Sequence, residues 1–307
     1  MKQLQNTDSI PRSGLDVAEL AGDVAVFLNG VHDPASEVPA FIESIVRSGR
    51  DEEQLIRLFA DLDARPESEW IVQLLKGYAE GALTETADRL IGTADTDLRE
   101  GILQTLPAFG EAGKQAASEL VEKTGLAGDQ FFKTEPVKQI QFFAAIGDRR
   151  RLHEVHSRLM REAESDIFHQ RGLERYFPTL HQRHKIPEVF AGVGRPDLAA
   201  ALFRKYHDTI RSYSWDHQLF LTSYLRFLIE QGHYEEAESV FTRVTRKSLR
   251  VDLRLLAQLY KNWGKLDEWE ERTAPMYLST GNRILMSEWT TALAEGREMV
   301  EYKPVSW

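Results

Sequence analysis

Two pairs of histidines in the middle of the chain have a spacing that suits metal binding. His153 and His156 are three residues apart, and His181 and His184 repeat this spacing. Because residues i and i+3 lie on the same face of a helix, the four imidazoles form a candidate metal site between two helical hairpins. The zinc-protease helix, in contrast, places its two histidines at i and i+4. His156 also falls on the apolar face of its helix, which favours a hydrogen-bonded core histidine over a metal ligand, and we predict no metal site.

Other catalytic patterns are incomplete. Residues 110–115 contain a Gly-Lys pair, but they lack the spacing of a phosphate-binding loop and the Ser or Thr that follows its lysine. The chain has no cysteine, which excludes disulfides, thiolate metal ligands and cysteine nucleophiles. We therefore predict neither a catalytic residue nor a cofactor. An enzyme or metal-dependent protein that uses the central His-rich segment is the alternative.

Charge is distributed unevenly along the sequence. The net charge is −10, yet residues 138–211 carry 14 Lys and Arg against 9 Asp and Glu, whereas residues 1–137 carry 12 against 25. Six of the nine histidines also lie in the basic segment. Such a segment would attract an acidic or phosphorylated part of a protein partner. Nucleic acid is a further alternative, which the acidic first part disfavours because it would repel a phosphate backbone.

The candidate binding residues combine the cations of this segment with two aromatic side chains. Tyr213 and Trp215 lie in a loop between two helical segments, and an exposed Tyr/Trp pair beside cations has the composition of a binding hot spot. The alternatives are a solvated helix face for the cations and core packing for the aromatic residues. The predicted binding set is Arg149, Arg150, Arg151, His153, His181, Arg183, His184, Lys185, Tyr213 and Trp215.

Four glycines mark the elements that must position these residues. Gly147, Gly194, Gly232 and Gly264 each follow one apolar-periodic segment and precede another. Glycine is favoured at the left-handed position that ends a helix, because it has no Cβ. Each of these glycines is therefore predicted to be the turn of a helical hairpin. Their spacings of 47, 38 and 32 residues lie around the length of helical-hairpin repeats.

A common apolar face follows each of these glycines. The residues five, eight, nine and twelve positions later fall on one face of a helix. Three of the four copies keep that face mostly apolar, and the copy after Gly264 decays, as expected of a terminal repeat. The predicted core positions are Leu152, Val155, His156 and Leu159; Ala199, Leu202, Phe203 and Tyr206; Ala237, Val240, Phe241 and Val244; and Trp269, Arg272, Thr273 and Met276.

Residues 136–280 resemble tetratricopeptide and pentatricopeptide repeats. The resemblance is clearest in the segment Gly-His-Tyr-Glu-Glu-Ala-Glu-Ser-Val-Phe, residues 232–241. The early Trp and the Leu-Gly pair of the tetratricopeptide consensus are missing. The resemblance implies stacked helical hairpins whose exposed surface binds a protein or peptide partner.

The first half of the chain resembles a different helical repeat. Leu98, Ile102, Leu106 and Phe109 form an apolar stripe that ends at Gly110, and a second helix follows directly. This arrangement is similar to a HEAT repeat, although Pro107 within the first helix departs from the pattern. Further amphipathic helices are predicted around Phe41/Ile45, Leu55/Leu62, Trp70/Tyr78 and Ala87/Ile91, and one more from Leu15 to Leu28.

We therefore expect an all-α fold, a right-handed α-solenoid of stacked helical hairpins. The expected parts are an N-terminal tail and first helix in residues 1–35, HEAT-like repeats in 36–130, tetratricopeptide-like repeats in 131–295, and a C-terminal tail in 296–307. The tail could cap the last repeat or dock into a partner. The chain shows neither a leader nor an apolar stretch of about 20 residues, so a soluble cytoplasmic protein without membrane contact is expected. The expected function is a non-catalytic protein- or peptide-binding scaffold or adaptor subunit of a larger complex.

Overall fold

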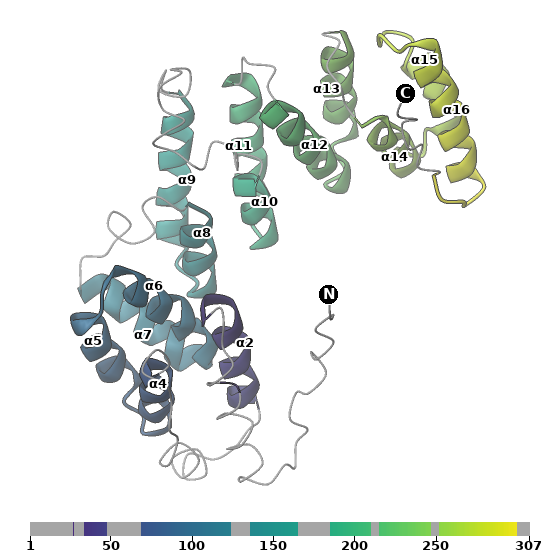
Figure 1. The fold of residues 1–307 in the computed structure, drawn as a ribbon. Coiled ribbons are helices and arrows are strands. Elements are labelled where there is room, and N and C mark those ends of the chain that lie inside the picture. The colour runs from purple at the N-terminus through teal and green to yellow at the C-terminus, as the bar shows by residue number, and fades with distance from the viewer. Residues whose placement is uncertain are drawn as a thin grey trace. The chain divides into compact units, whose positions relative to one another are not determined.

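All regular elements in the described part of the chain are helices. The computed structural model describes residue 27 and residues 34–47, 69–123, 136–164, 185–209, 215–246 and 252–299, and no strand occurs among them (Figure 1). The all-α expectation is therefore confirmed for these residues. The predicted helices at 15–28 and 55–62 fall almost entirely outside the described residues. No helix in the described ranges is both long and apolar enough to cross a membrane.

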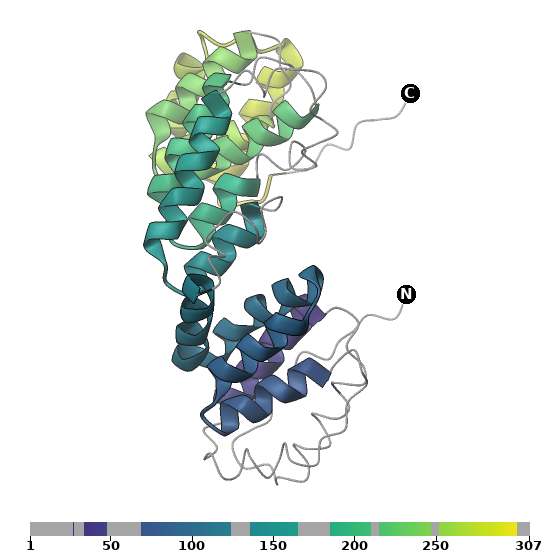
Figure 2. The same cartoon turned by 90° about the vertical axis from the view of Figure 1, so that its left-hand side faces the viewer.

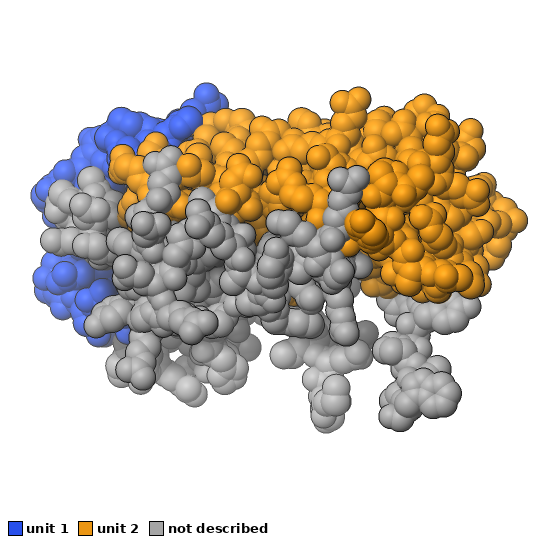
Figure 3. All heavy atoms as spheres, turned by 90° about the horizontal axis from the view of Figure 1, so that it is seen from above, with its two compact units in different colours: residues 1–155 blue, residues 156–307 orange. Residues whose placement is uncertain are grey.

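The chain divides into two compact units, residues 1–155 and 156–307 (Figure 3). The boundary falls within one helix, α9, which runs from Arg149 to Glu164. Each unit has its own apolar core.

The first unit is a cluster of short helices, drawn in purple and blue shades in Figure 2. α2 packs on α6 and on the short 3₁₀ helix η2, and α5 packs on α4, α6 and α7. Pro107 explains the break between α6 and α7, because a proline inside a helix removes a hydrogen bond and favours a tighter turn. The elements are α2 (Pro34–Arg47), α4 (Glu69–Ala79), α5 (Leu83–Thr93), α6 (Thr96–Thr105), η2 (Leu106–Phe109), α7 (Gly110–Lys123) and α8 (Pro136–Ala145).

The second unit consists of successive helical hairpins. α10 packs on α11 and α12 packs on α13, while α14 contacts α12, α13 and α16. We call α10, α12 and α14 the first helices, and α11, α13 and α15 the second helices. Their bounds are α10 (Lys185–Gly192), α11 (Pro196–Thr209), α12 (Trp215–Glu230), α13 (Tyr234–Arg246), α14 (Leu253–Trp263), η6 (Leu266–Glu268), α15 (Trp269–Arg272) and α16 (Thr280–Ala294).

The predicted glycine turns are confirmed at all four positions. Gly147, Gly194, Gly232 and Gly264 have φ values between 71° and 76°. At Gly194 the backbone N–H donates to the carbonyl of Ala191 at 3.0 Å, and the N–H of the next residue donates to that of Phe190 at 2.9 Å. This pair of bonds is the Schellman motif, which satisfies the last carbonyls of the helix. The same pair of bonds also occurs after α4, at Gly81, and after α16, at Gly296, where the sequence pattern did not reveal it.

The predicted core face is confirmed in the hairpins that follow Gly147, Gly194 and Gly232. All twelve residues at these positions are buried, among them His156. In the copy after Gly264, Thr273 and Met276 are buried, whereas Trp269 and Arg272 are partly exposed. The sequence predicts that the apolar pattern is weaker in this last copy, and in the structure its second helix, α15, is only a single helical turn.

Candidate interaction surface

The predicted histidines do not form a metal site within the described residues. His153 is exposed, whereas His156 is buried, with its Nε2 3.2 Å from the carbonyl oxygen of Leu198 and its ring edge-on to Phe190. His156 is thus a hydrogen-bonded core residue. No group of three or more His, Asp or Glu residues that could hold a metal ion occurs in the part of the chain that the structure describes. His181, Arg183 and His184 lie outside that part, so the alternative of a four-histidine site is not tested.

The three consecutive arginines of α9 occupy different environments. Arg149 is exposed, and Arg150 is an exposed partner of Glu154, with Nη1 2.8 Å from Oε1. Arg151 is only 5 % exposed; its side chain donates to Asp148, which also accepts a bond from the Arg151 backbone N–H at 2.9 Å. Arg151 therefore stabilises the hairpin turn. The expectation that it is a surface cation needs correction, because a residue cannot be both a buried turn contact and a contact for a partner.

The remaining predicted site residues are only partly described. Lys185 is exposed at the start of α10. Trp215 is the first residue of α12, where only its backbone is described, and Tyr213 lies outside the described residues. The structure thus does not bring the predicted set together as one described site, and Arg149, Arg150, His153 and Lys185 remain as its exposed described members.

A cross-hairpin ion pair that the sequence analysis missed joins α11 to α13. Arg204 donates from Nε and Nη2 to the two carboxylate oxygens of Glu236, at 2.8 and 2.7 Å, and the hydroxyl of Tyr224 on α12 donates to the same carboxylate at 2.7 Å. Hydrogen bonding from Arg204 lowers the pKa of Glu236 to about 2. Burial, followed by the neighbouring carboxylate, raises the pKa of the Tyr224 hydroxyl, so it stays protonated and keeps its donor.

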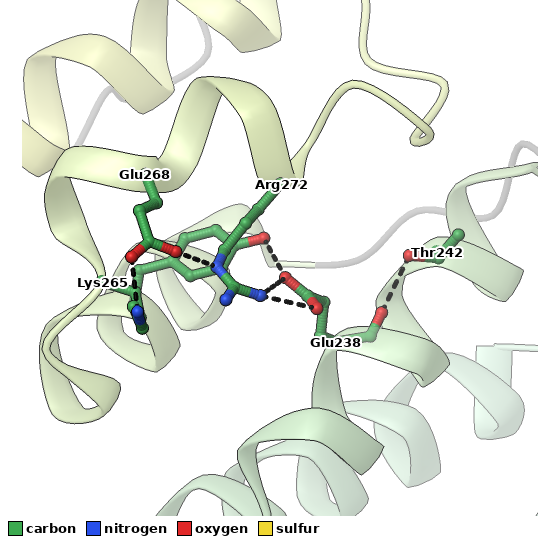
Figure 4. Close-up of polar contacts among 6 residues, drawn as sticks. Glu238, Thr242, Lys265, Glu268 and Arg272 are labelled. Carbon is green, nitrogen blue, oxygen red and sulfur yellow. Dashed lines mark hydrogen bonds and ion pairs between the residues drawn. The ribbon is translucent and has the colours of Figure 1, made fainter.

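A second ion pair of the same kind joins α13 to α15. Nη1 of Arg272 lies 3.3 Å from both carboxylate oxygens of Glu238, and the hydroxyl of Tyr260 on α14 donates to this carboxylate at 3.1 Å (Figure 4). The Arg272 Nε donates to Glu268 at 2.9 Å, and Lys265 is a further partner of Glu268. The hydrogen bond from Lys265, followed by that from Arg272, lowers the pKa of Glu268.

The arginine of this second pair also has an aromatic contact. Its guanidinium carbon lies 4.3 Å from the ring centroid of Trp263, the last residue of α14, and Trp263 stacks on Tyr234 of α13. A signal for this arrangement was present in the sequence. Arg272 occupies a position where the other copies have Val or Leu, and such a replacement on an apolar face calls for a specific partner.

The first helices present a different kind of surface. From Leu219 to Glu230 in α12, only Leu219, Thr222, Arg226 and Glu230 are not buried, and their spacing places them on one stripe. Leu219 is 39 % exposed, one of few large apolar side chains in the described ranges to be so open. From Leu219 to Glu230, α12 therefore meets solvent along this single stripe.

The neighbouring first helix, α14, is open along a similar stripe. α13 packs on both α12 and α14, and these two first helices also contact each other directly. We call these two stripes together the first-helix surface. It consists of Leu219, Thr222, Arg226 and Glu230 on α12, and Leu255, Gln258, Lys261 and Asn262 on α14.

Cations on the two kinds of helix differ in their pairing. Arg204 and Arg272 on second helices are paired with glutamates of a neighbouring hairpin. Lys185, Arg226 and Lys261 on the three first helices are all exposed, and none of them forms an ion pair with another described residue. Arg254 of α14, in contrast, is paired with Asp252, so Lys185, Arg226 and Lys261 are the described first-helix cations that remain available to a ligand.

Comparisons with known proteins give no further guide to the function of this surface. No family model, curated protein or solved structure matches the chain.

Proposed function

We propose that the chain is a right-handed α-solenoid that works as a non-catalytic protein-binding scaffold in the cytoplasm. Three observations support stacked hairpins as the architecture of the second unit: the recurring Schellman turn, the common buried register, and the ion pairs that join consecutive second helices. Contacts of α14 with both α12 and α16 also fit such a stack. Stacked hairpins expose a large surface relative to their mass, which suits them to binding other proteins.

The first-helix surface is the proposed binding site. The observation that carries this proposal is that Arg226 and Lys261 are exposed and unpaired among the described residues, whereas Arg204 and Arg272 are paired with glutamates of a neighbouring hairpin. The partly open Leu219 lies two helical turns before Arg226 on the same stripe. Unpaired cations next to an exposed apolar side chain suit a protein segment that carries carboxylates or phosphates together with apolar residues.

An affinity experiment tests the proposed function. The tagged chain is used to capture proteins from its native lysate, with and without nuclease, and each protein identified is then purified and titrated with the chain by calorimetry. We expect one protein that survives nuclease treatment and binds the purified chain with a defined stoichiometry. Loss of all binding after nuclease treatment, or no binding by any purified candidate, would contradict the proposal.

A further inference from the structure

Two glutamates of α13 reach toward opposite neighbours. Glu236 and Glu238 are two residues apart, so their side chains leave the helix about 200° apart. Glu236 binds Arg204 of α11, the second helix of the preceding hairpin, while Glu238 binds Arg272 of α15, the second helix of the following hairpin. One helix thus holds both inter-hairpin ion pairs, which we call the α11–α13 clasp and the α13–α15 clasp.

Each clasp joins three helices. The carboxylate of Glu236 accepts from Arg204 on α11 and from Tyr224 on α12. The carboxylate of Glu238 accepts from Arg272 on α15 (Figure 4) and from Tyr260 on α14. Each glutamate therefore bonds one first helix and one second helix at the same time. Because each glutamate connects three helices, it restricts the angle between the two hairpins. A single contact between two helices would leave them free to rotate about that contact.

The clasps do not supply the cohesion of the unit. The core between the hairpins is apolar; for instance, the ring of Phe203 on α11 packs against those of Phe220, Tyr224 and Phe227 on α12, at centroid distances of 5.1–5.7 Å. Apolar burial is strong but not directional. The two parallel N–H bonds from Arg204 to Glu236 have strict geometry. Arg272 reaches Glu238 through Nη1 alone, and its bond to Glu268 and its contact with the Trp263 ring fix the orientation of the guanidinium. The apolar core therefore holds the hairpins together, and the clasps select the angle at which they pack.

We infer that Glu236 and Glu238, acting through Arg204 and Arg272, are positioning residues that fix the angle between consecutive hairpins and with it the spacing of the first helices. The inference rests on the proposed function, because the spacing between α12 and α14 sets the distance between the two stripes of the first-helix surface. The α13–α15 clasp controls that spacing, and the α11–α13 clasp controls the spacing between α10 and α12.

Distances between spin labels test this inference. The chain has no cysteine, so two introduced cysteines are the sole labelling sites. One label pair is placed at Arg226→Cys and Lys261→Cys to measure the α12–α14 distance, and another at Lys185→Cys and Arg226→Cys to measure the α10–α12 distance. Each pair is measured by double electron–electron resonance in the otherwise unchanged chain, in Arg272→Met and in Arg204→Met.

The design is crossed, so that each variant is the control for the other. We expect Arg272→Met either to shift the α12–α14 distance distribution or to increase its width at least twofold. The α10–α12 distance distribution should stay unchanged. Arg204→Met is expected to do the reverse. Methionine keeps a long apolar side chain, and circular dichroism must show unchanged helix content in both. Distributions unaffected by either variant, or both broadened by each, would overturn the inference.

A rescue and a binding measurement complete the test. The charge-exchanged variant Arg204→Glu/Glu236→Arg is expected to narrow the α10–α12 distance distribution again, and a width equal to that of Arg204→Met would contradict the positioning role.

In calorimetry with the captured partner, Arg272→Met is expected to weaken binding at least fivefold although Arg272 lies outside the first-helix surface. Unchanged affinity would overturn the positioning role and leave the proposed function standing. If no partner is found, the proposed function fails, and the distance measurements still decide whether the clasps set the spacing.

Discussion

Arg204 on α11 and Glu236 on α13 are 32 residues apart in the sequence and are joined by two nearly parallel hydrogen bonds of 2.8 and 2.7 Å. The pair connects two consecutive hairpins through polar side chains, which the apolar pattern of the sequence does not predict to be partners. It is also half-exposed, with 49 % of the Arg204 side chain and 31 % of the Glu236 side chain accessible. An ion pair that is exposed to this extent contributes about 1 kcal/mol to stability. The directional geometry of its two hydrogen bonds therefore matters more for the arrangement of the hairpins than its energy does for stability.

The stability that this pair contributes should depend on pH. Glu236 has a pKa lowered from 4.5 to about 2, chiefly by Arg204, so its contribution is complete above the unfolded-state value and is lost as the pH falls toward 2. We expect Glu236→Gln to lower the free energy of unfolding by about 1 kcal/mol at pH 7 and by progressively less between pH 5 and pH 2. Urea denaturation of both proteins across this range measures the difference. Glu235→Gln, at an exposed neighbouring position, is the control and should show no such trend.

Alanine substitutions at two nearby glycines of the α10–α11 hairpin distinguish the effect of backbone strain from the effect of side-chain packing. Gly194 has φ +76°, Gly192 is helical, and a Cβ on either would meet no atom within 4 Å. Gly194→Ala should therefore destabilise the protein by about 1 kcal/mol through the left-handed conformation alone. Gly192→Ala should stabilise it by up to about 1 kcal/mol. Equal effects of the two substitutions in thermal unfolding would show that the turn does not depend on the left-handed residue.

The buried register can be tested at Ala237. This residue is 0 % exposed, so Ala237→Asp would bury a carboxylate without a partner, at an expected cost of about 3–5 kcal/mol. Ser239→Asp, two residues later on the exposed side of α13, should change stability by no more than about 0.5 kcal/mol. Chemical denaturation of both variants compares them. A tolerated aspartate at position 237 would mean that the helix faces are assigned wrongly.

The arginines of α9 should respond differently to charge reversal. Arg151→Glu places a carboxylate beside Asp148 in a buried turn contact, and we expect a loss of about 2–4 kcal/mol. Arg149→Glu, on the exposed side of the same helix turn, should leave the melting temperature nearly unchanged. Differential scanning calorimetry distinguishes them. Similar melting temperatures for both variants would show that Arg151 is a surface cation, as its sequence neighbours suggest.

Local rules account for the parts of this fold that could be predicted from the sequence. The left-handed glycines and the helical apolar period depend on neighbouring residues, so they identify the turns at Gly147, Gly194, Gly232 and Gly264 and the buried faces after them. The turns at Gly81 and Gly296 obey the same rule; Gly296 follows Gly264 by 32 residues, the spacing between Gly232 and Gly264, so this turn was predictable, whereas Gly81 lies 66 residues before Gly147. Pro107 was noted as a departure, and the structure resolves it as a short 3₁₀ turn between α6 and α7.

Partners that are distant in the sequence account for what could not be predicted. A run of arginines does not reveal that Arg151 turns inward to Asp148 while Arg149 faces solvent. Likewise, Glu236 resembles any solvent-exposed glutamate of a helix until the hairpins are assembled and Arg204 comes within reach. The composition therefore identifies a basic segment. The contacts in the assembled hairpins are needed to distinguish cations that are paired within the protein from cations that remain available to a ligand.

The most direct test of the proposed binding surface is a calorimetric titration of the captured partner with Arg226→Glu/Lys261→Glu, compared with Arg149→Glu/Arg150→Glu at the competing binding residues on α9 that the sequence predicts. We predict that the first variant weakens binding at least tenfold, about 1.4 kcal/mol, with unchanged helix content, and that the α9 variant binds within about twofold of the original chain. Unchanged affinity of Arg226→Glu/Lys261→Glu, or an equal loss in the α9 variant, would contradict the assignment of the first-helix surface as the binding site.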